Sequence, residues 1–140
     1  MTDNTIRKSI YIKASREQVW EYLTQPELLK AWFHAPKSPL THQEPYEMFG
    51  ADSGDKLMWG KVRDAQPYDR LEYTFSIGPM NGATSKVIWT LKDVEGGTRL
   101  SLVHSGLPRG AEAFGLTLAL DKGWDGHIAK LREALSKLDA

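Results

Sequence analysis

The chain has 140 residues, 41% hydrophobic and 26% charged, which is ordinary for one folded domain and too apolar for extensive disorder. Its 18 Lys and Arg balance its 18 Asp and Glu, which argues against a nucleic-acid-binding protein, because such proteins neutralise phosphates with clustered cations. The absence of cysteine excludes disulfides, thiolate metal sites and cysteine nucleophiles. We expect a single domain over residues 1–140.

The N-terminal segment gives no sign of export. MTDNTIRKSIYIKAS is polar and lacks the apolar centre of a signal peptide. No apolar run approaches the roughly 20 residues that span a bilayer. We therefore expect no membrane span and a cytoplasmic location.

A strand followed by two short helices is predicted next. Ile6–Lys13 alternates apolar and polar residues, as a half-buried strand does. Ser15 stands where its hydroxyl can cap a helix by accepting a hydrogen bond from a first-turn amide. Pro26 ends that helix and suits the first turn of a second one, which we expect to run to Phe33.

Alternating segments in the middle of the chain predict an antiparallel meander. A Pro-containing turn joins two of them, and Gly96 and Gly97 supply the turn of a later hairpin. Together with the first strand they make about six strands; the predicted segments are Tyr46–Phe49, Lys56–Asp64, Arg70–Ile77, Ser85–Asp93 and Thr98–Ser105.

From about Arg109 the apolar period changes to 3.6, which predicts one long helix. About 25 helical residues would reach on the order of 40 Å, enough to cross a sheet. Three glycines weaken its first half and predict a bend or a close approach of a neighbouring element there. The apolar positions are Phe114, Leu118, Trp124, Ile128, Leu131, Leu135 and Leu138, and the glycines are Gly115, Gly123 and Gly126.

This order of elements belongs to the α+β class, with a curved antiparallel sheet wrapped around the C-terminal helix. Four segments in the same order resemble the START-like (SRPBCC, Bet v 1-like) superfamily, in the branch of activators of the heat-shock-protein-90 ATPase. They are SREQVWEYLTQPELLKAWF, GKVRDAQPYDRLEYTFS, VIWTLKDVEGGTRLSLVHSGLP and GWDGHIAKLREAL. The resemblance implies the helix-grip fold, a ligand-binding cavity, a possible chaperone partner and a role in stress response.

In a helix-grip fold, a cavity between sheet and helix would be lined by aromatic residues that combine apolar area with a few polar groups. Taken one by one, the same residues fit an ordinary core better, whereas five Trp and five Tyr together favour a pocket that supplies partners for their N–H and O–H groups. The candidates are Trp32, Trp59, Tyr73, Phe75, Trp89, His104, Phe114, Leu118 and Trp124.

His104 and Tyr73 are the candidate catalytic residues. His104 follows Leu100 and Leu102 at strand period two, so we expect it to face inward, as a general acid or base or as a structural histidine with a backbone partner. Lys61 and Arg63 share a strand face with Trp59. If that face points inward, one of them could bind an anionic ligand group; if it points outward, both are solvated.

Other catalytic signals are weak. His34, His42 and His127 have no partners at metal-ligand spacing, so we expect no metal site and no cofactor. Three hypotheses remain. The first is binding of a small apolar or amphipathic molecule without catalysis, the second a cyclase or hydrolase using a cavity His and Tyr, and the third a chaperone-interacting module.

Overall fold

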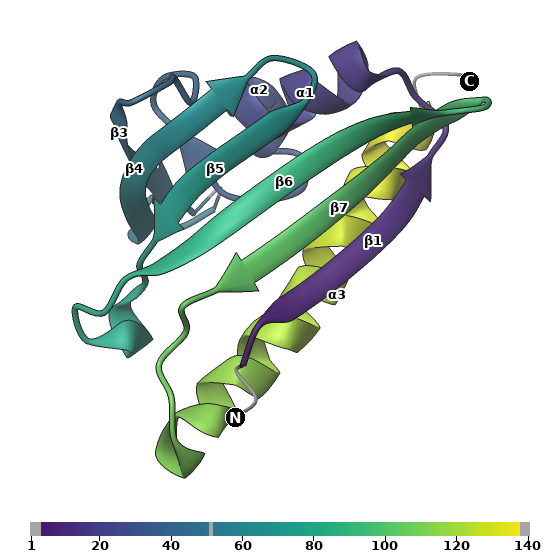
Figure 1. Cartoon of the computed structure of the whole chain (residues 1–140). Helices are drawn as coiled ribbons and strands as arrows, with labels where there is room; N and C mark the ends of the chain where they lie inside the picture. Colours follow the sequence, from purple (N-terminus) through teal and green to yellow (C-terminus); the bar gives the residue numbers. More distant parts are fainter. Residues whose placement is uncertain (1–3, 51, 138–140) are drawn as a thin grey trace.

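In the computed structural model, residues 4–50 and 52–137 are described, and they form one seven-stranded antiparallel sheet with a long helix along one face (Figure 1). The strands are, in spatial order, β1 (Ile6–Ile12), β7 (Gly97–Ser105), β6 (Ser85–Val94), β5 (Arg70–Phe75), β4 (Lys56–Gln66), β3 (Pro45–Phe49) and β2 (Ala35–Pro36). The helices are α1 (Arg16–Thr24), α2 (Pro26–Leu29) and α3 (Phe114–Ser136), with 3₁₀ turns η1 (Gly78–Met80) and η2 (Ala111–Ala113).

The predicted α+β class and helix-grip arrangement are confirmed. The sheet has one strand more than expected, because the two residues of β2 pair with the end of β3. The second helix ends at Leu29, before Phe33, and the amides of Trp32 and Phe33 both donate to the Leu29 carbonyl in a tight turn. Leu138 lies outside the described residues.

Ser15 caps α1 as predicted. Its hydroxyl accepts a hydrogen bond from the Gln18 amide, and the Gln18 side chain accepts one from the Ser15 amide, a complete capping box. The cap directs Val19 and Leu23 into the core, where both are buried.

Two register shifts bend the sheet. One lies between Met48 and Phe49 where β3 pairs with β4, and the other between Val62 and Asp64 where β4 pairs with β5. Such bulges increase local twist, so the β3–β4 end of the sheet turns away from the plane of β5, β6 and β7 (Figure 1).

The core lies between the inner face of the sheet and the second half of α3. Trp124, Ile128, Leu131 and Leu135 are buried there, and they are the buried residues of this helix. The first half of α3 extends past the ends of β1 and β7 (Figure 1) and buries no residue completely.

One of the two roles that the sequence predicts for the glycines of α3 is wrong. A Cβ atom added at Gly115, Gly123 or Gly126 would meet nothing within 4 Å. The expected close approach is therefore wrong, and the helix runs unbroken through all three positions.

Candidate functional site

A small, mostly apolar cavity lies between α3 and the β4–β5 end of the sheet; we call it the inner cavity. Its volume is about 130 Å³, below the common range of ligand pockets but close to the volume that holds a benzene ring in an apolar core. The sheet, the α2–β2 segment and α3 all contribute to its lining: Phe33, His34, Met58, Phe75, Ile77, Ala119, Leu120, Gly123, Trp124 and His127.

A second depression, the mouth groove, adjoins the inner cavity. The two share Phe33, His34 and His127, and the mouth groove has a volume of about 370 Å³. Outside the shared residues, its charged lining comes from Lys30, Asp52 and Lys130. The three shared rings therefore separate an apolar space from a polar one.

The shared rings pack closely. Phe33 stacks on His34, with ring centroids 4.5 Å apart, and meets His127 edge-on at 4.7 Å. Phe33 also stacks on Trp124 at 5.4 Å. Since Phe33 follows a tight turn after α2 and carries no regular secondary structure of its own, its position depends on these ring contacts.

Both histidines of the mouth are neutral at pH 7. Burial, with a smaller effect of His127, lowers the pKa of His34 to about 4. Burial also lowers the pKa of His127, helped by Lys130 and opposed by the hydrogen bond to the Trp32 carbonyl. That carbonyl can only accept, so His127 Nδ1 donates at 3.1 Å, which leaves Nε2 of the neutral ring as an acceptor.

His104 lies elsewhere, in a completely buried hydrogen-bonded chain. Trp124 Nε1 donates to His104 Nδ1 at 3.0 Å, so the proton of the neutral ring is on Nε2 and points to Ser85 Oγ at 2.7 Å. The Ser85 hydroxyl donates to the Phe75 carbonyl at 3.2 Å. Burial lowers the pKa of His104 to about 4, and every group of the chain is satisfied with the histidine neutral.

Tyr73 is held by a different tryptophan. Trp89 Nε1 donates to the Tyr73 hydroxyl at 3.0 Å, and burial raises the pKa of this phenol. Neither Tyr73 nor His104 lines the inner cavity. The geometry therefore does not bring the two candidate catalytic groups to a common open space.

The structure does not bring the nine predicted cavity residues together. Phe75 and Trp124 line the inner cavity. Trp32 and Trp89 are buried in the core, and the Trp32 indole donates to the Tyr22 carbonyl. Trp59 lies on the outer face of β4.

Three of these placements correct the sequence analysis. Trp59 points outward because Met58 and Val62 occupy the inner face of β4. Phe114 and Leu118 are 50% and 55% exposed, since the part of α3 that carries them extends beyond the sheet.

Sequence reasoning missed most of the lining, including Met58, His34 and His127. The two histidines are far apart in the sequence and meet only when α3 folds over the α2–β2 segment. One local signal was available: His127 follows Trp124 by three residues, which places both side chains on one face of a helix.

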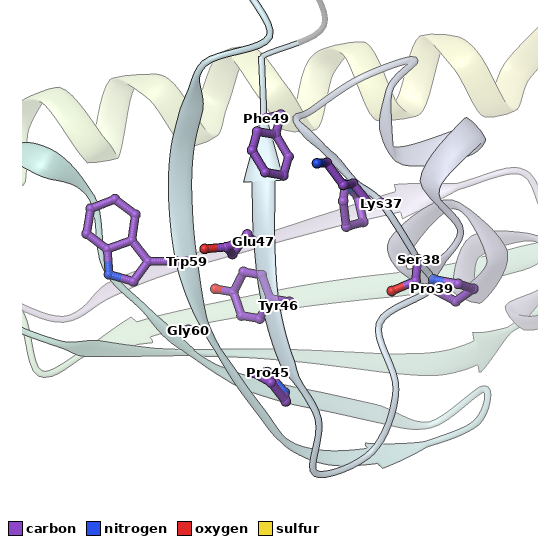
Figure 2. Close-up of a pocket in the computed structure, with 10 residues that line it drawn as sticks. Lys37, Ser38, Pro39, Pro45, Tyr46, Glu47, Phe49, Trp59 and Gly60 are labelled. Atoms are coloured by element: carbon purple, nitrogen blue, oxygen red, sulfur yellow. The ribbon is translucent and has the colours of Figure 1, made fainter.

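A larger depression, the outer groove, lies on the other face of the sheet beside β3 and has a volume of about 530 Å³. Figure 2 shows Trp59 on one side of β3 and Lys37, Ser38 and Pro39 on the other. Lys37 Nζ lies 4.9 Å from the centre of the Phe49 ring, and Lys56 Nζ 5.2 Å from that of Trp59.

Two further observations bear on the kind of site. Within residues 4–50 and 52–137, no three His, Asp or Glu side chains come together as metal ligands. No helix in the same part of the chain combines the length and apolarity needed to cross a membrane.

Similar folds occur among solved structures. Protein MLL2253 from Mesorhizobium loti superposes with a TM-score of 0.85 at 24% identity, over 97% of this chain and 99% of that one. DynU16, a protein in the dynemicin biosynthetic locus, gives 0.78 at 27% identity over 96% of this chain and 48% of its own. The Aha1 dimer from Colwellia psychrerythraea gives 0.75 at 20% identity over 96% of each chain.

A comparison with curated proteins gives no match. The sequence profile described as "Activator of Hsp90 ATPase homolog 1-like protein" matches residues 13–136, which is most of the chain and includes every element that lines the inner cavity. The chain therefore belongs to the family of Activator of Hsp90 ATPase homolog 1-like proteins.

Proposed function

We propose that the protein binds a small apolar or amphipathic molecule in the inner cavity and does not transform it. The observation that carries the proposal is the composition of the cavity wall. Aliphatic and aromatic side chains surround the space, and the polar side chains His34 and His127 stand at its mouth. A wall of this kind favours apolar ligands and orients them with few polar contacts.

The buried histidine supports binding over catalysis. A general acid or base must reach the substrate within hydrogen-bonding distance. His104 is 0% exposed, and Ser85 and Trp124 occupy both of its ring nitrogens. A cyclase or hydrolase using His104 and Tyr73 would first have to break this arrangement.

Access to the cavity is available through the first half of α3. Ala119, Leu120 and Gly123 form the helical wall, in a part of the helix that lacks completely buried residues. Displacing this half moves the partly buried Leu116 and Leu120 away from the core but exposes no completely buried residue, so a small ligand could enter at modest cost.

Thermal unfolding with small apolar probes tests the proposal. Toluene, indole and 1-hexanol suit the cavity volume, and a probe at 100 times its Kd should stabilise the fold by about 2.7 kcal/mol. The melting temperature should then rise by roughly 5–15 °C. No stabilisation by any probe would contradict the proposal.

A matched pair of variants locates the binding. Gly123→Leu adds a side chain at the cavity wall, whereas Gly126→Leu makes the same change on α3 away from the cavity; a Cβ has open space at both positions. We expect Gly123→Leu to abolish probe-dependent stabilisation and Gly126→Leu to retain it. Equal loss in both variants would place binding elsewhere.

A second candidate function is binding to a heat-shock-protein-90 chaperone. The family description and one surface feature support it. Among the described residues, β2 pairs with Met48 and Phe49 alone, so the rest of β3 forms an edge beside the outer groove. Such an edge can accept an extended segment of a partner. Calorimetric titration with the chaperone tests this, with Trp59→Ala expected to weaken binding and Gly123→Leu to leave it unchanged.

A further inference from the structure

The mouth groove joins an apolar space to a cationic surface. It shares Phe33, His34 and His127 with the inner cavity, and Lys30 and Lys130 line its polar part. A molecule that fills the inner cavity with its apolar end must therefore place its other end in the mouth groove or leave the groove to water.

The two lysines are available to a ligand. None of the ion pairs in the described part of the chain includes Lys30 or Lys130. By contrast, Asp121 and Asp125 of α3 form ion pairs. Their Oδ1 atoms lie 2.7 and 2.9 Å from Lys8 Nζ.

The remaining charges of the groove define the charge of a matching ligand. Asp52 contributes one negative charge against the two lysines, and both histidines are neutral at pH 7 because burial lowers their pKa. The groove therefore carries a net charge of +1, which one monoanionic group would neutralise.

We propose that the natural ligand is a small amphipathic carboxylic acid, with its ring or short chain in the inner cavity and its carboxylate between Lys30 and Lys130. This inference rests on the proposed function. A partly desolvated carboxylate needs both a countercharge and hydrogen-bond donors, and the lysines supply both. Neutral His34 also has an N–H, and no hydrogen bond within the described residues uses its ring.

A monoanionic carboxylate fits better than a phosphate ester. A phosphate monoester carries a charge of about −1.5 to −2 at pH 7 and would leave negative charge unbalanced in a groove of net charge +1. A neutral alcohol would leave both lysines without a partner. The apolar part must be small, on the order of one ring, because the inner cavity has a volume of about 130 Å³.

Paired probes test the head group separately from apolar binding. Calorimetric titration compares hexanoate with 1-hexanol, phenylacetate with 2-phenylethanol, and hexanoate with hexyl phosphate. We expect each acid to bind about tenfold more tightly than its alcohol in low salt. Raising the ionic strength to 0.5 M should remove much of that difference, because partly exposed charges are screened.

Charge-removing variants identify the partner groups. Lys30→Gln and Lys130→Gln should each weaken acid binding about threefold to fivefold and leave alcohol binding within a factor of about two. Lys122→Gln, on the same helix but outside both depressions, serves as the matched control and should leave acid binding unchanged. Because all three lysines are exposed, the variants should fold normally.

The possible results separate this inference from the proposed function. Equal binding of acids and alcohols, or acid binding that neither Lys30→Gln nor Lys130→Gln weakens, overturns the carboxylate assignment and leaves apolar binding standing. Tighter binding of hexyl phosphate than of hexanoate also overturns it. If neither acids nor alcohols bind, both proposals fail.

Discussion

His104 shows what a single polar residue does in this core. It fixes the relative positions of three elements, because Trp124 of α3, Ser85 of β6 and its own strand β7 meet at one imidazole. Each bond satisfies a group that would otherwise be buried without a partner, at a cost of about 1–3 kcal/mol per group. The residue thus favours one docking position of α3 on the sheet.

Acid should weaken this arrangement. In the unfolded chain His104 binds a proton near pH 6.5, whereas in the folded chain burial lowers its pKa to about 4. The unfolded state therefore binds more protons in between, and stability falls as the pH drops from about 6.5 to 4, by at most roughly 3 kcal/mol from this residue.

Urea unfolding at pH 7 and pH 4.5 measures the effect in the wild type and in His104→Gln. The glutamine side chain of this variant can still accept a hydrogen bond from Trp124 and donate one to Ser85, but it does not titrate. The variant should therefore lose less stability on acidification. His34, whose pKa is also lowered to about 4, keeps a part of the acid sensitivity in both proteins. Identical losses would contradict a titrating His104.

The alternation of β7 correctly places His104 inward, but its partners could not be predicted, because Ser85 and Trp124 come from distant elements. Trp59 shows the opposite error. Its aromatic character favours burial, yet Lys61 and Arg63 share its strand face, and the cost of burying two cations turns that face to solvent. The charges of Lys61 and Arg63 therefore predict the orientation of this strand face better than the aromatic character of Trp59 does.

At the scale of elements, the packing of β4 against its neighbours depends on one glycine. A Cβ at Gly60 would overlap the Thr74 carbonyl oxygen. That oxygen accepts a hydrogen bond from the Tyr46 hydroxyl at 2.6 Å, while the Thr74 hydroxyl accepts one from the Lys61 amide at 2.8 Å. Three strands thus meet at a point where only glycine fits.

Gly60→Ala should therefore destabilise the fold by about 1–3 kcal/mol, because the Thr74 carbonyl must move and the Tyr46 bond stretches. Gly78→Ala is the matched control, since a Cβ there meets nothing within 4 Å, and it should change stability by less than about 0.5 kcal/mol. Denaturant unfolding of both variants gives the comparison. If Gly60→Ala left the free energy of unfolding unchanged, the strands would have to separate without cost at this point, which would contradict the prediction.

The long helix was predictable from its period, and its glycines indicated a weaker first half, but the exposure of Phe114 and Leu118 could not be predicted. Phe114 and Leu118 continue the apolar positions of Ile128 and Leu131, so the sequence alone indicates that they are buried. Where the sheet ends depends on the lengths of β1 and β7, and those strands stop before the first half of α3 is covered (Figure 1).

Hydrogen exchange should reveal this inequality. Amides of residues 118–123 should exchange at least about tenfold faster than those of residues 128–135, because the first half can open without exposing a completely buried residue. Mass spectrometry of exchanged peptides measures the difference. Binding of a probe to the inner cavity should slow residues 118–123 selectively, and uniform protection along α3 would contradict the proposed route of entry.

At the scale of the whole molecule, fold and family could be predicted because they depend on the order of elements and on short-range patterns. The inner cavity could not be predicted, because its volume depends on how the sheet bends and on how side chains from three separated segments pack. The same distinction explains why Trp124 could be proposed as lining, whereas Met58 and His34 could not.

The balanced charge of the chain has a measurable consequence. With a formal net charge of zero at pH 7 and half-exposed Phe114 and Leu118, the protein should be least soluble near neutral pH. Leu118→Lys should raise solubility at pH 7, measured by polyethylene glycol precipitation, and change stability by less than about 0.5 kcal/mol. Unchanged solubility would mean that this apolar surface does not mediate self-association.

The pairing of β1 with β7 implies an order of events during synthesis. Ile6 pairs with His104 and Ile12 with Thr98, so β1 finds its neighbour only after β7, the last strand of the sheet in chain order, has been made. Until then its apolar face has no sheet to join. The β6–β7 hairpin forms locally and can serve as a template, which makes the nascent β1 strand the segment that most needs protection from premature association.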